Sequence, residues 1–326
     1  MGVLIRLVAW TLLVLATILT GLRFLQLEQP AAQQALVFTA WTIPMFAVAL
    51  LLFLFHVFFP GKGRWQVTMA LAGLSLVGLV LQGWWMSPLF VGDKPTPGPG
   101  AEPFRVLTLN LDTGTADPND VVSTAVTSGA DIVILQEVVP NTLTRMESAG
   151  LDSVYPHRAG QPLVNGRYGT MVFSNASLSD VTYLGTHSTT VQVKATVPQQ
   201  QVWLLAVGVP APGTGAPEPW LADLQQLVAT ARELHPAIVA GDFEATFDHQ
   251  PFADLLDLGF RDVGERANAG WQRTWPTDRS RFGISFPRIG QLDHVLVGSS
   301  LAAVSQDTLS VPGSDHRGVL AEVAFR

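Results

Sequence analysis

The sequence predicts an α/β fold of stacked sheets flanked by helices, preceded by three transmembrane helices. Three observations support this prediction. The first 92 residues contain three long apolar stretches, residues 93–103 are rich in proline and glycine, and from residue 104 onward short apolar runs alternate with helical patterns. Strands interleaved with helices on this scale are typical of stacked sheets covered by helices. We therefore expect a membrane domain at 1–92, a linker at 93–103 and a globular domain at 104–326.

The three apolar stretches are each long enough to cross a bilayer, which takes about 20 residues. They cover about residues 3–22, 35–59 and 65–90. A cleavable signal peptide would explain only the first, and no small-residue cleavage site follows it. A buried soluble core is a poor explanation, because the segments are apolar on all sides. Pro44 lies inside the second stretch, where neighbouring helices make a kink tolerable.

The loop PGKGR between the second and third stretches sets the expected orientation. It contains Lys62 and Arg64, and short cytoplasmic loops are enriched in such residues. We therefore expect the N-terminus in the cytoplasm and the globular domain on the extracytoplasmic side of the cell membrane. Arg23 lies on the outer loop in this topology and counts mildly against it, although Glu28 is nearby.

Charge divides the chain at the same place as hydropathy. Residues 1–100 carry five basic and two acidic residues, whereas residues 101–326 carry 14 basic and 24 acidic residues. Nucleic-acid affinity rests on neutralising phosphates with Lys and Arg, so long nucleic acid is a poor partner for the acidic second part. The absence of cysteine excludes disulfides and structural Cys-zinc sites.

The elements of the globular domain follow the linker in sequence. Asp117-Pro118 and Glu218-Pro219 are typical of capped helix starts. Expected strands are residues 105–111, 132–136, 169–174, 191–197, 202–207, 237–240, 294–297 and 318–325. Expected helices are residues 118–128, 141–149, 220–234 and 251–258.

Polar residues stand at the ends of several of these apolar runs. Asn110 closes FRVLTLN, Glu137 closes DIVILQE, Asp242 ends the run in HPAIVAGDFEATFD, and Asp315-His316 lies in VPGSDHRGVLAEV. Open α/β folds gather their chemistry at the C-terminal ends of strands. A divalent cation that handles phosphate needs carboxylates converging from separate strands. The pattern therefore predicts a metal-assisted site at one sheet edge.

With these motifs in this order, residues 103 to 326 resemble the endonuclease/exonuclease/phosphatase superfamily. That superfamily includes deoxyribonucleases, apurinic endonucleases, neutral sphingomyelinases and inositol-phosphate phosphatases. The resemblance implies a four-layered α/β sandwich with its site at one edge. It also implies a metal site at Asn110, Glu137 and Asp315, where oxygen ligands suit Mg²⁺ or Mn²⁺.

The resemblance assigns catalytic roles as well. Asp293, in QLDHVLVG, would hold His316, fixing its tautomer and favouring its cationic form. His316 would take a proton from the attacking water or stabilise the phosphorane, and Asp242 would align that water. His294 is expected to be structural, because it alternates to the opposite face of the strand.

Two positions depart from the family pattern. Glu244 stands where the family has an asparagine that donates to the phosphate, and an ionised glutamate repels phosphate. It fits catalysis if it is protonated, binds a metal or turns away. Gly208, or a residue beside it, stands where the family has a phosphate-contacting histidine. His187 is too far upstream to replace that histidine.

Some further residues are weaker candidates for the site. Arg167 and Tyr168 are expected to contribute to substrate binding, and Arg158 would supply positive charge in the same way. A surface ion pair explains either arginine at least as well. Trp275, in TWP, is more typical of core or loop packing than of a ligand platform.

Two classes of function remain open. The first is a membrane-anchored, metal-dependent phosphoester hydrolase with a lipid or cell-envelope phosphodiester as substrate, where the tether raises the effective concentration of that substrate. The second is a catalytically weakened family member that serves as a binding or interaction module. A Glu244 carboxylate pointing into the site favours metal-rich or binding chemistry, and one pointing outward favours ordinary hydrolysis. A secreted nuclease is disfavoured by the charge and the three spans.

Overall fold

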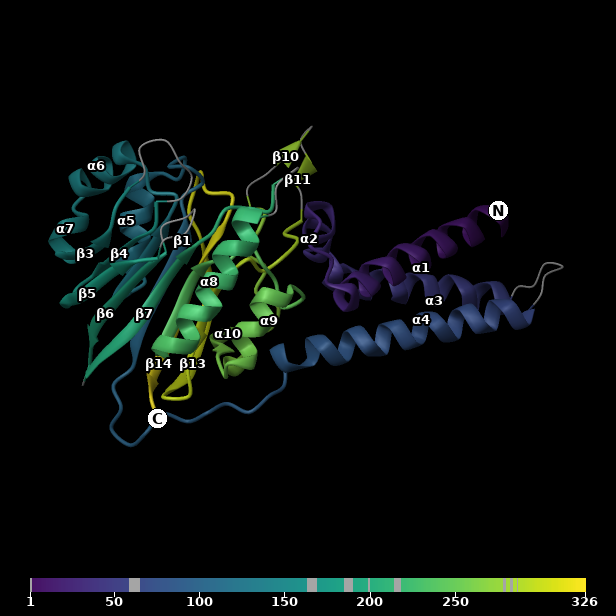
Figure 1. Ribbon diagram of the computed structural model, residues 1–326. Coiled ribbons are helices and arrows are strands. Elements are labelled where there is room, and N and C mark those ends of the chain that lie inside the picture. Colours follow the sequence, from purple (N-terminus) through teal and green to yellow (C-terminus); the bar gives the residue numbers. More distant parts are fainter. Residues whose placement is uncertain are drawn as a thin grey trace. The chain divides into compact units, whose positions relative to one another are not determined.

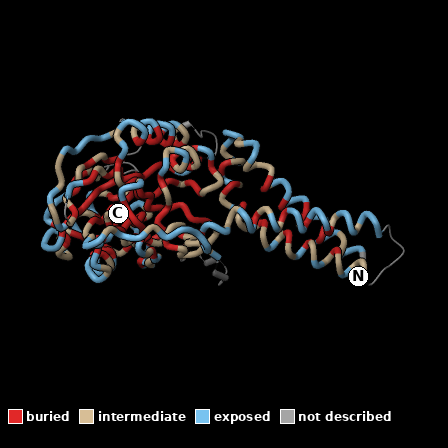
Figure 2. The backbone as a smooth tube through the Cα atoms, turned by 90° about the horizontal axis from the view of Figure 1, so that it is seen from below, coloured by how far each residue is buried: buried red, intermediate tan, exposed pale blue. Residues whose placement is uncertain are grey.

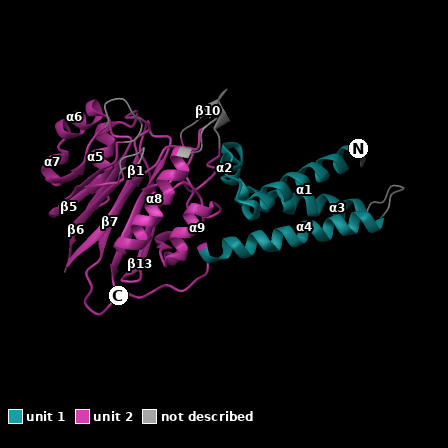
Figure 3. Ribbon diagram, in the orientation of Figure 1, with its two compact units in different colours: residues 1–88 teal, residues 89–326 magenta. Residues whose placement is uncertain are grey.

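The computed structural model describes residues 2–58, 65–162, 169–184, 190–198, 200–213, 218–277, 280–281, 284–285 and 287–326. The chain divides into two compact units, residues 1–88 and 89–326 (Figure 3). Each unit has its own cluster of buried apolar side chains.

The first unit is helical. Its elements are α1 (Gly2–Leu25), α2 (Pro30–Leu36), the 3-10 helix η1 (Thr39–Trp41), α3 (Thr42–Phe58) and α4 (Trp65–Met86), with η2 (Ser87–Leu89) directly after α4. Three segments are long and apolar enough to cross a membrane, which agrees with the expected number of spans. These segments are Val3–Leu25, Thr39–Val57 and Trp65–Leu89.

The second span begins later than the sequence predicted. Residues 35–38, assigned to it from their apolar composition, belong to α2 and a turn. The candidate span begins with η1 at Thr39, and α3 begins at Thr42. Pro44 therefore lies in the first turn of α3, where backbone N–H groups have no partner within the helix. The proline removes no helical hydrogen bond at that position, so no kink has to be tolerated there.

Small and polar residues join the three long helices. A Cβ at Gly78 of α4 would lie 2.5 Å from the ring of Phe46 in α3, so the glycine permits their close approach. The Gln82 amide of α4 donates a 2.9 Å hydrogen bond to the buried hydroxyl of Thr20 in α1. Leu51 and Val77 are more than 60% exposed, as expected of apolar side chains that face lipid.

Two six-stranded mixed sheets form the second unit (Figure 1). One has the order β13-β14-β1-β2-β4-β3 and the other β5-β6-β7-β8-β12-β9. The first sheet contains β1 (Phe104–Asn110), β2 (Ile132–Gln136), β3 (His157–Gly160), β4 (Met171–Ser174), β13 (Leu301–Ser310) and β14 (Arg317–Phe325). The second contains β5 (Leu178–Tyr183), β6 (Val191–Val197), β7 (Gln200–Gly208), β8 (Ile238–Asp242), β9 (Arg261–Asp262) and β12 (Asp293–Val297). The short strands β10 (Ser280–Arg281) and β11 (Ile284–Ser285) pair separately.

Alternation along the strands produces four layers. Phe104 and Val106 of β1 point into the core between the sheets, whereas Leu107 and Leu109 point to the opposite face and pack beneath helices. Buried residues follow the strands through the middle of the unit (Figure 2). The first sheet is covered by α5 (Pro118–Thr127), α6 (Pro140–Ser148) and α7 (Leu151–Val154), and the second by α8 (Glu218–Leu234) and α9 (Gln250–Asp257). The expected sandwich of two sheets flanked by helices is confirmed.

Local signals explain which elements were predicted. The Asp117 side chain accepts hydrogen bonds from two backbone N–H groups at the start of α5, which is the expected N-cap. The expected strand at 169–174 begins at Met171. Six strands were not predicted: the longer β3, β5 and β13 and the two-residue strands β9, β10 and β11. The residues of β5 are half-buried or exposed, and β13 mixes small and polar residues, so neither has a clear apolar run.

Candidate active site

Two parallel strand pairs end at the same edge of the sandwich. Asn110 ends β1 opposite Gln136 of β2, and Gly208 ends β7 opposite Asp242 of β8. Asp293 begins β12 opposite Asp242. The Asn110 side-chain amide donates a 2.8 Å hydrogen bond to Asp242 Oδ2, which joins the two sheets. This edge of the sandwich therefore gathers the polar residues that the sequence singled out.

The glycine before Asp242 explains how two strands come so close. Gly241 has a φ of +149°, and a Cβ there would lie 1.9 Å from the carbonyl oxygen of Val207 in β7. Only glycine fits such an approach. Glu244 and Glu137 have φ values of +47° and +56°, in the left-handed region that non-glycine residues seldom adopt. Such outliers are common at functional sites.

Glu137 is held by the loop after β1. Its Oε2 accepts hydrogen bonds from the backbone N–H and the hydroxyl of Thr113, at 2.6 and 2.8 Å. Its Oε1 lies 3.3 Å from the Asn110 amide nitrogen, which also donates to Asp242. The Asn110 oxygen accepts from the Asp112 N–H at 2.8 Å. Asn110 therefore orients two carboxylates. Thr113 was not predicted as a site residue.

His316 is paired with Asp293 in a buried position. Its Nδ1 lies 2.8 Å from Asp293 Oδ2 and 3.9 Å from Asp242 Oδ2, and its Nε2 lies 3.8 Å from Asp315 Oδ1. Burial alone lowers the pKa of His316, but the charges of Asp293 and Asp242 and the hydrogen bond to Asp293 together raise this pKa well above its ordinary value. The site therefore favours an imidazolium at His316.

The Asp242 carboxylate is almost completely buried. Burial raises its pKa to about 7, the charge of Asp293 adds to this effect, and His316 and the Asn110 hydrogen bond oppose it. Burial, followed by the charge of Asp242, likewise raises the pKa of Glu244 well above its ordinary value. Two carboxyls that face each other in this environment favour sharing a proton.

Glu244 points toward the other site residues. One ligand atom each from Asp242, Glu244 and His316 lies within 4.8 Å of the other two, which is close enough for all three to hold one metal ion. The Glu244 backbone N–H also donates a 2.9 Å hydrogen bond to Asp242 Oδ1. Of the two orientations considered from the sequence, the observed one favours metal-rich or binding chemistry.

The residues present suit a hard divalent cation. The expected metal residues Asn110 and Glu137 are in contact, and Asp315 reaches the group through His316. Buried Asp293 Oδ1 has no hydrogen-bond partner among the described residues. Carboxylate oxygens match Mg²⁺ or Mn²⁺ better than softer ions. The Asn110 oxygen already accepts a backbone hydrogen bond, so its orienting role is better supported than a role as ligand.

Gly208 lies beside Asp242, where the departure from the family histidine was expected. A Cβ at Gly208 would lie 2.4 Å from Thr170 Oγ1 and 3.0 Å from Gln136 Cγ. Thr170 Oγ1 is buried and has no hydrogen-bond partner among the described residues. A histidine side chain would therefore need Thr170 to move.

Other candidates fall outside this group. Arg167, Tyr168 and His187 lie outside the described residues. Arg158, on β3, forms an ion pair with Glu147. Trp275, expected to be a packing residue, donates its indole N–H to Asp315 Oδ2 at 3.2 Å. This contact spans 40 positions, and no local sequence pattern indicates it.

His294 belongs to a second, fully buried histidine–aspartate pair. Its Nδ1 lies 2.9 Å from Asp262 Oδ2, and its Nε2 lies 3.1 Å from the Ala245 carbonyl oxygen. The ring packs against Phe252, with centroids 4.3 Å apart. His294 thus joins β12 to the loop that follows β8, in keeping with the structural role expected for it.

Comparison with known proteins identifies the family. The sequence model described as "Endonuclease/Exonuclease/phosphatase family" matches residues 107–316, about two thirds of the chain. The chain belongs to this family. No curated protein matches its sequence.

Several solved structures share the fold. An endonuclease/exonuclease/phosphatase from Beutenbergia cavernae is 19% identical, with a TM-score of 0.55 over 69% of this chain and 72% of that one. The 3′ phosphatase NExo from Neisseria, bound to a product DNA hairpin, is also 19% identical, with a TM-score of 0.55 over 67% of this chain and 98% of its own. TDP2 from D. rerio, complexed with a single-strand DNA product, is 15% identical, with a TM-score of 0.54 over 68% and 99%. At these identities the likeness concerns the fold.

Proposed function

We propose that this family member is a metal-dependent phosphoester hydrolase anchored to a membrane. The observation that carries the proposal is the buried Asp293–His316 pair, which stands beside the Asp242 and Glu244 carboxylates at the strand ends. Carboxylates suited to a cation and an imidazole suited to a phosphate lie close together there. Membership of the family supports phosphoester chemistry in general, and a 3′ phosphatase is among the solved structures that share the fold.

Mg²⁺ or Mn²⁺ is the proposed cofactor. Glu137 and Asp315, together with Glu244, would hold it. A bound divalent cation would neutralise phosphate charge and polarise the phosphoryl oxygen. Trp275 and Thr113 keep two of these carboxylates in position through hydrogen bonds to Asp315 and Glu137.

The chain's own groups would move the protons. Asp242, with a pKa of about 7, is suited to accept a proton from an attacking water near neutral pH. His316 keeps Nδ1–H on Asp293 and presents Nε2 toward the Asp315 side of the site, where a cationic ring stabilises developing negative charge. Asn110 donates to Asp242 and keeps its carboxylate oriented.

We infer the substrate class from the net charge of the globular part and from the proposed membrane anchor. The globular part carries 14 basic and 24 acidic residues, which disfavours long nucleic acid. We propose a lipid-derived or cell-envelope phosphodiester, acted on at the extracytoplasmic side. The positive loop PGKGR supports that orientation. A C-terminal alkaline phosphatase fusion should then be active and a cytoplasmic reporter at the same point silent. The reverse pattern would overturn the orientation.

The full-length protein in detergent would be assayed with Mn²⁺ and Mg²⁺ against an aryl phosphodiester, phospholipid head-group esters and short nucleotides. We expect metal-dependent hydrolysis that falls by about 10² or more in Asp242→Asn and in His316→Gln. Arg145→Gln, on exposed α6, is the control and should retain the rate.

Binding without turnover is the second candidate function. The observation that favours it is Glu244, an acidic side chain inside the site where the family has an amide. Metal binding by the protein, combined with no hydrolysis of any substrate in that panel, would select the binding module over the enzyme.

A further inference from the structure

Two adjoining pockets lie at the end of the second sheet opposite the candidate active site. Their volumes are about 500 and 330 Å³, and they share Gly259, Gly298 and Ser299. β12 begins at Asp293 in the candidate active site and ends at Val297, which lines the larger pocket. Strands rise about 3.3 Å per residue, so the length of this strand separates the two places by about 13 Å. We call the two pockets together the basic groove.

Cationic side chains gather in the basic groove. Those lining it are Lys94, Arg232, Arg261, Arg266 and Arg326. Asp93 is the one acidic side chain among its described lining residues. Residues 101–326 contain 24 acidic and 14 basic residues, yet four of the basic ones and none of the acidic ones line the groove. Glu265 interacts with Arg261 and Arg266 and offsets part of their charge. The groove is therefore a positively charged region in a domain whose net charge is negative.

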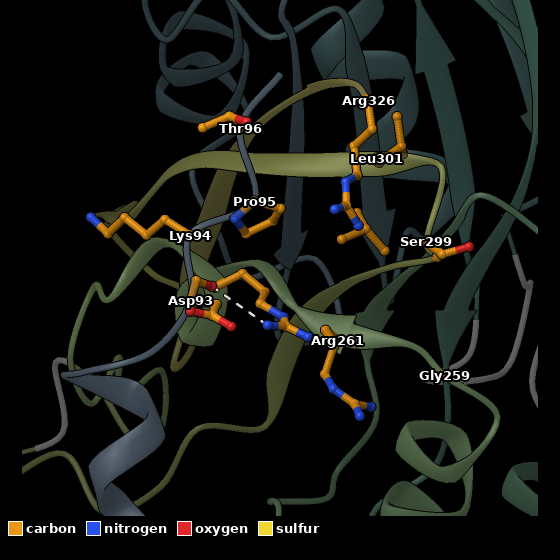
Figure 4. A pocket seen from close by; sticks show the side chains of 12 residues that line it. Asp93, Lys94, Pro95, Thr96, Gly259, Arg261, Ser299, Leu301 and Arg326 are labelled. Carbon is orange, nitrogen blue, oxygen red and sulfur yellow. Dashed lines mark hydrogen bonds between the residues drawn. The ribbon is translucent and has the colours of Figure 1, made fainter. Parts of the chain in front are cut away.

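Some of these cations are fixed and others are free to reach a ligand. Arg261 Nη1 donates to the carbonyl oxygens of Leu256 and Phe260, both at 2.7 Å, so this guanidinium is held in place. Arg266 Nη1 lies 3.5 Å from the Asp93 carbonyl oxygen (Figure 4). Lys94 and Arg232 are exposed. A fixed arginine with exposed cations around it suits an anion with several oxygens.

The chain connects the groove to the last candidate span. That span ends at Leu89, and Lys94 follows five residues later, so at most about 18 Å of extended chain separates them. Within the second unit, the Gly270 N–H donates to the Leu89 carbonyl at 2.9 Å, and the Asn268 amide donates to that of Gly92 at 3.3 Å. The segment leaving the span is thereby fastened to the domain near the groove. Phosphates of anionic lipids are concentrated at a membrane surface.

We propose that the basic groove is a second site, separate from the catalytic edge, that binds a phosphate group. The phosphate belongs to an anionic phospholipid head group at the membrane surface or to a soluble phosphate ester such as glycerol phosphate. Lys94, Arg232 and the fixed Arg261 bind the phosphate, and these contacts hold the acidic domain to its ligand. The site does not depend on the hydrolase reaction, because none of its residues belongs to the active site.

The test uses the full-length protein in a neutral detergent. Native mass spectrometry would count retained phosphatidylglycerol against phosphatidylcholine, and calorimetry would measure glycerol phosphate binding. Lys94→Glu and Arg232→Glu are the groove variants. Arg145→Glu is the matched control, because Arg145 is also an exposed arginine in the last turn of a helix, α6, as Arg232 is in α8.

We expect preferential retention of phosphatidylglycerol that falls roughly tenfold in each groove variant and is unchanged in the control. Asp242→Asn should leave phosphatidylglycerol retention unchanged, whether or not the protein hydrolyses phosphoesters. Loss of glycerol phosphate binding alone in the groove variants would support the site and identify a soluble ligand. No binding of either phosphate by the unmodified protein, or equal losses in Arg145→Glu, would overturn the proposal.

Discussion

The imidazole of His316 donates from Nδ1 to Asp293 Oδ2 at 2.8 Å, and both side chains are almost completely buried. The carboxylate fixes the tautomer and leaves Nε2 facing Asp315, whose Oδ1 lies 3.8 Å away. The pair joins the start of β12 in one sheet to the residue before β14 in the other. A change at Asp293 should therefore reach the chemistry through His316.

Asp293→Asn should move the alkaline limb of the pH–rate profile to lower pH. The charge of Asp293 raises the pKa of His316, so its removal lowers this pKa, and the cationic ring is lost earlier as pH rises. An opposite charge at this distance is typically worth one to three units, so we expect a shift of about that size. Asp262→Asn, at the other histidine–aspartate pair, is the control and should leave the limb in place. If the alkaline limb does not move in Asp293→Asn, ionisation of His316 does not control the rate.

Removal of single carboxylates should identify the metal ligands. We expect Glu137→Ala, Asp315→Ala and Glu244→Ala each to weaken Mn²⁺ binding by about tenfold or more, because each removes an anionic oxygen. Calorimetry on the full-length protein measures this affinity. Asp120→Ala, an exposed acid in the first turn of α5, is the control. Unchanged affinity in both Glu137→Ala and Asp315→Ala would leave Asp242, Glu244 and His316 as the metal group.

Gly208→Ala should destabilise the protein by about 1–3 kcal/mol, because the new Cβ would crowd Thr170 Oγ1 and Gln136. Adding Thr170→Ala removes the nearest atom and should restore part of that loss. Denaturant unfolding measures both effects. Gly213→Ala, at an exposed position with open space around it, should have little effect. If Thr170→Ala gives no recovery, this contact is not what excludes a larger side chain.

Restoring the family residues at this edge also requires the smaller side chain at position 170. Gly208→His with Glu244→Asn adds two polar groups toward the phosphate, and Thr170→Ala makes room for the first. A gain in phosphodiesterase activity in the triple variant would indicate a competent scaffold that was retuned.

Alkaline pH should weaken the fold through Tyr155. Burial, with a further contribution from Asp131, raises the pKa of Tyr155 to about 12, so the folded state resists ionisation that the unfolded chain undergoes near pH 10. Stability is therefore lost as pH rises from 10 toward 12, by about 1 kcal/mol at pH 11. Tyr155→Phe should flatten this decline in denaturant unfolding, and Tyr183→Phe, at an exposed position, should not. Equal slopes in all three proteins would contradict the prediction.

The sequence was sufficient for the arrangement of the strand ends. Asn110, Asp242 and Asp293 each mark a transition between an apolar run and a polar residue, and this transition is local information. Parallel and antiparallel pairing then brings the marked positions to one edge. The same reasoning explains the layers, because alternation along β1 separates its two faces.

Contacts that depend on tertiary packing could not be predicted from the sequence. The inward direction of Glu244 depends on a left-handed backbone after β8, and Trp275 reaches Asp315 across 40 positions. The start of α3 was misjudged because apolar composition does not distinguish a span from the short helices before it. The basic groove draws its arginines from separate elements, so no run of charge indicated it.

The hydrogen bond between Asn110 and Asp242 joins residues 132 positions apart on different sheets. No short stretch of the chain can contain the site, and the site exists only after the two sheets of the sandwich have packed together. Whatever binds there binds the native state alone, so its free energy adds to the stability of the whole sandwich. The supply of that ligand would thus influence how long each copy of the protein survives proteolysis in the cell.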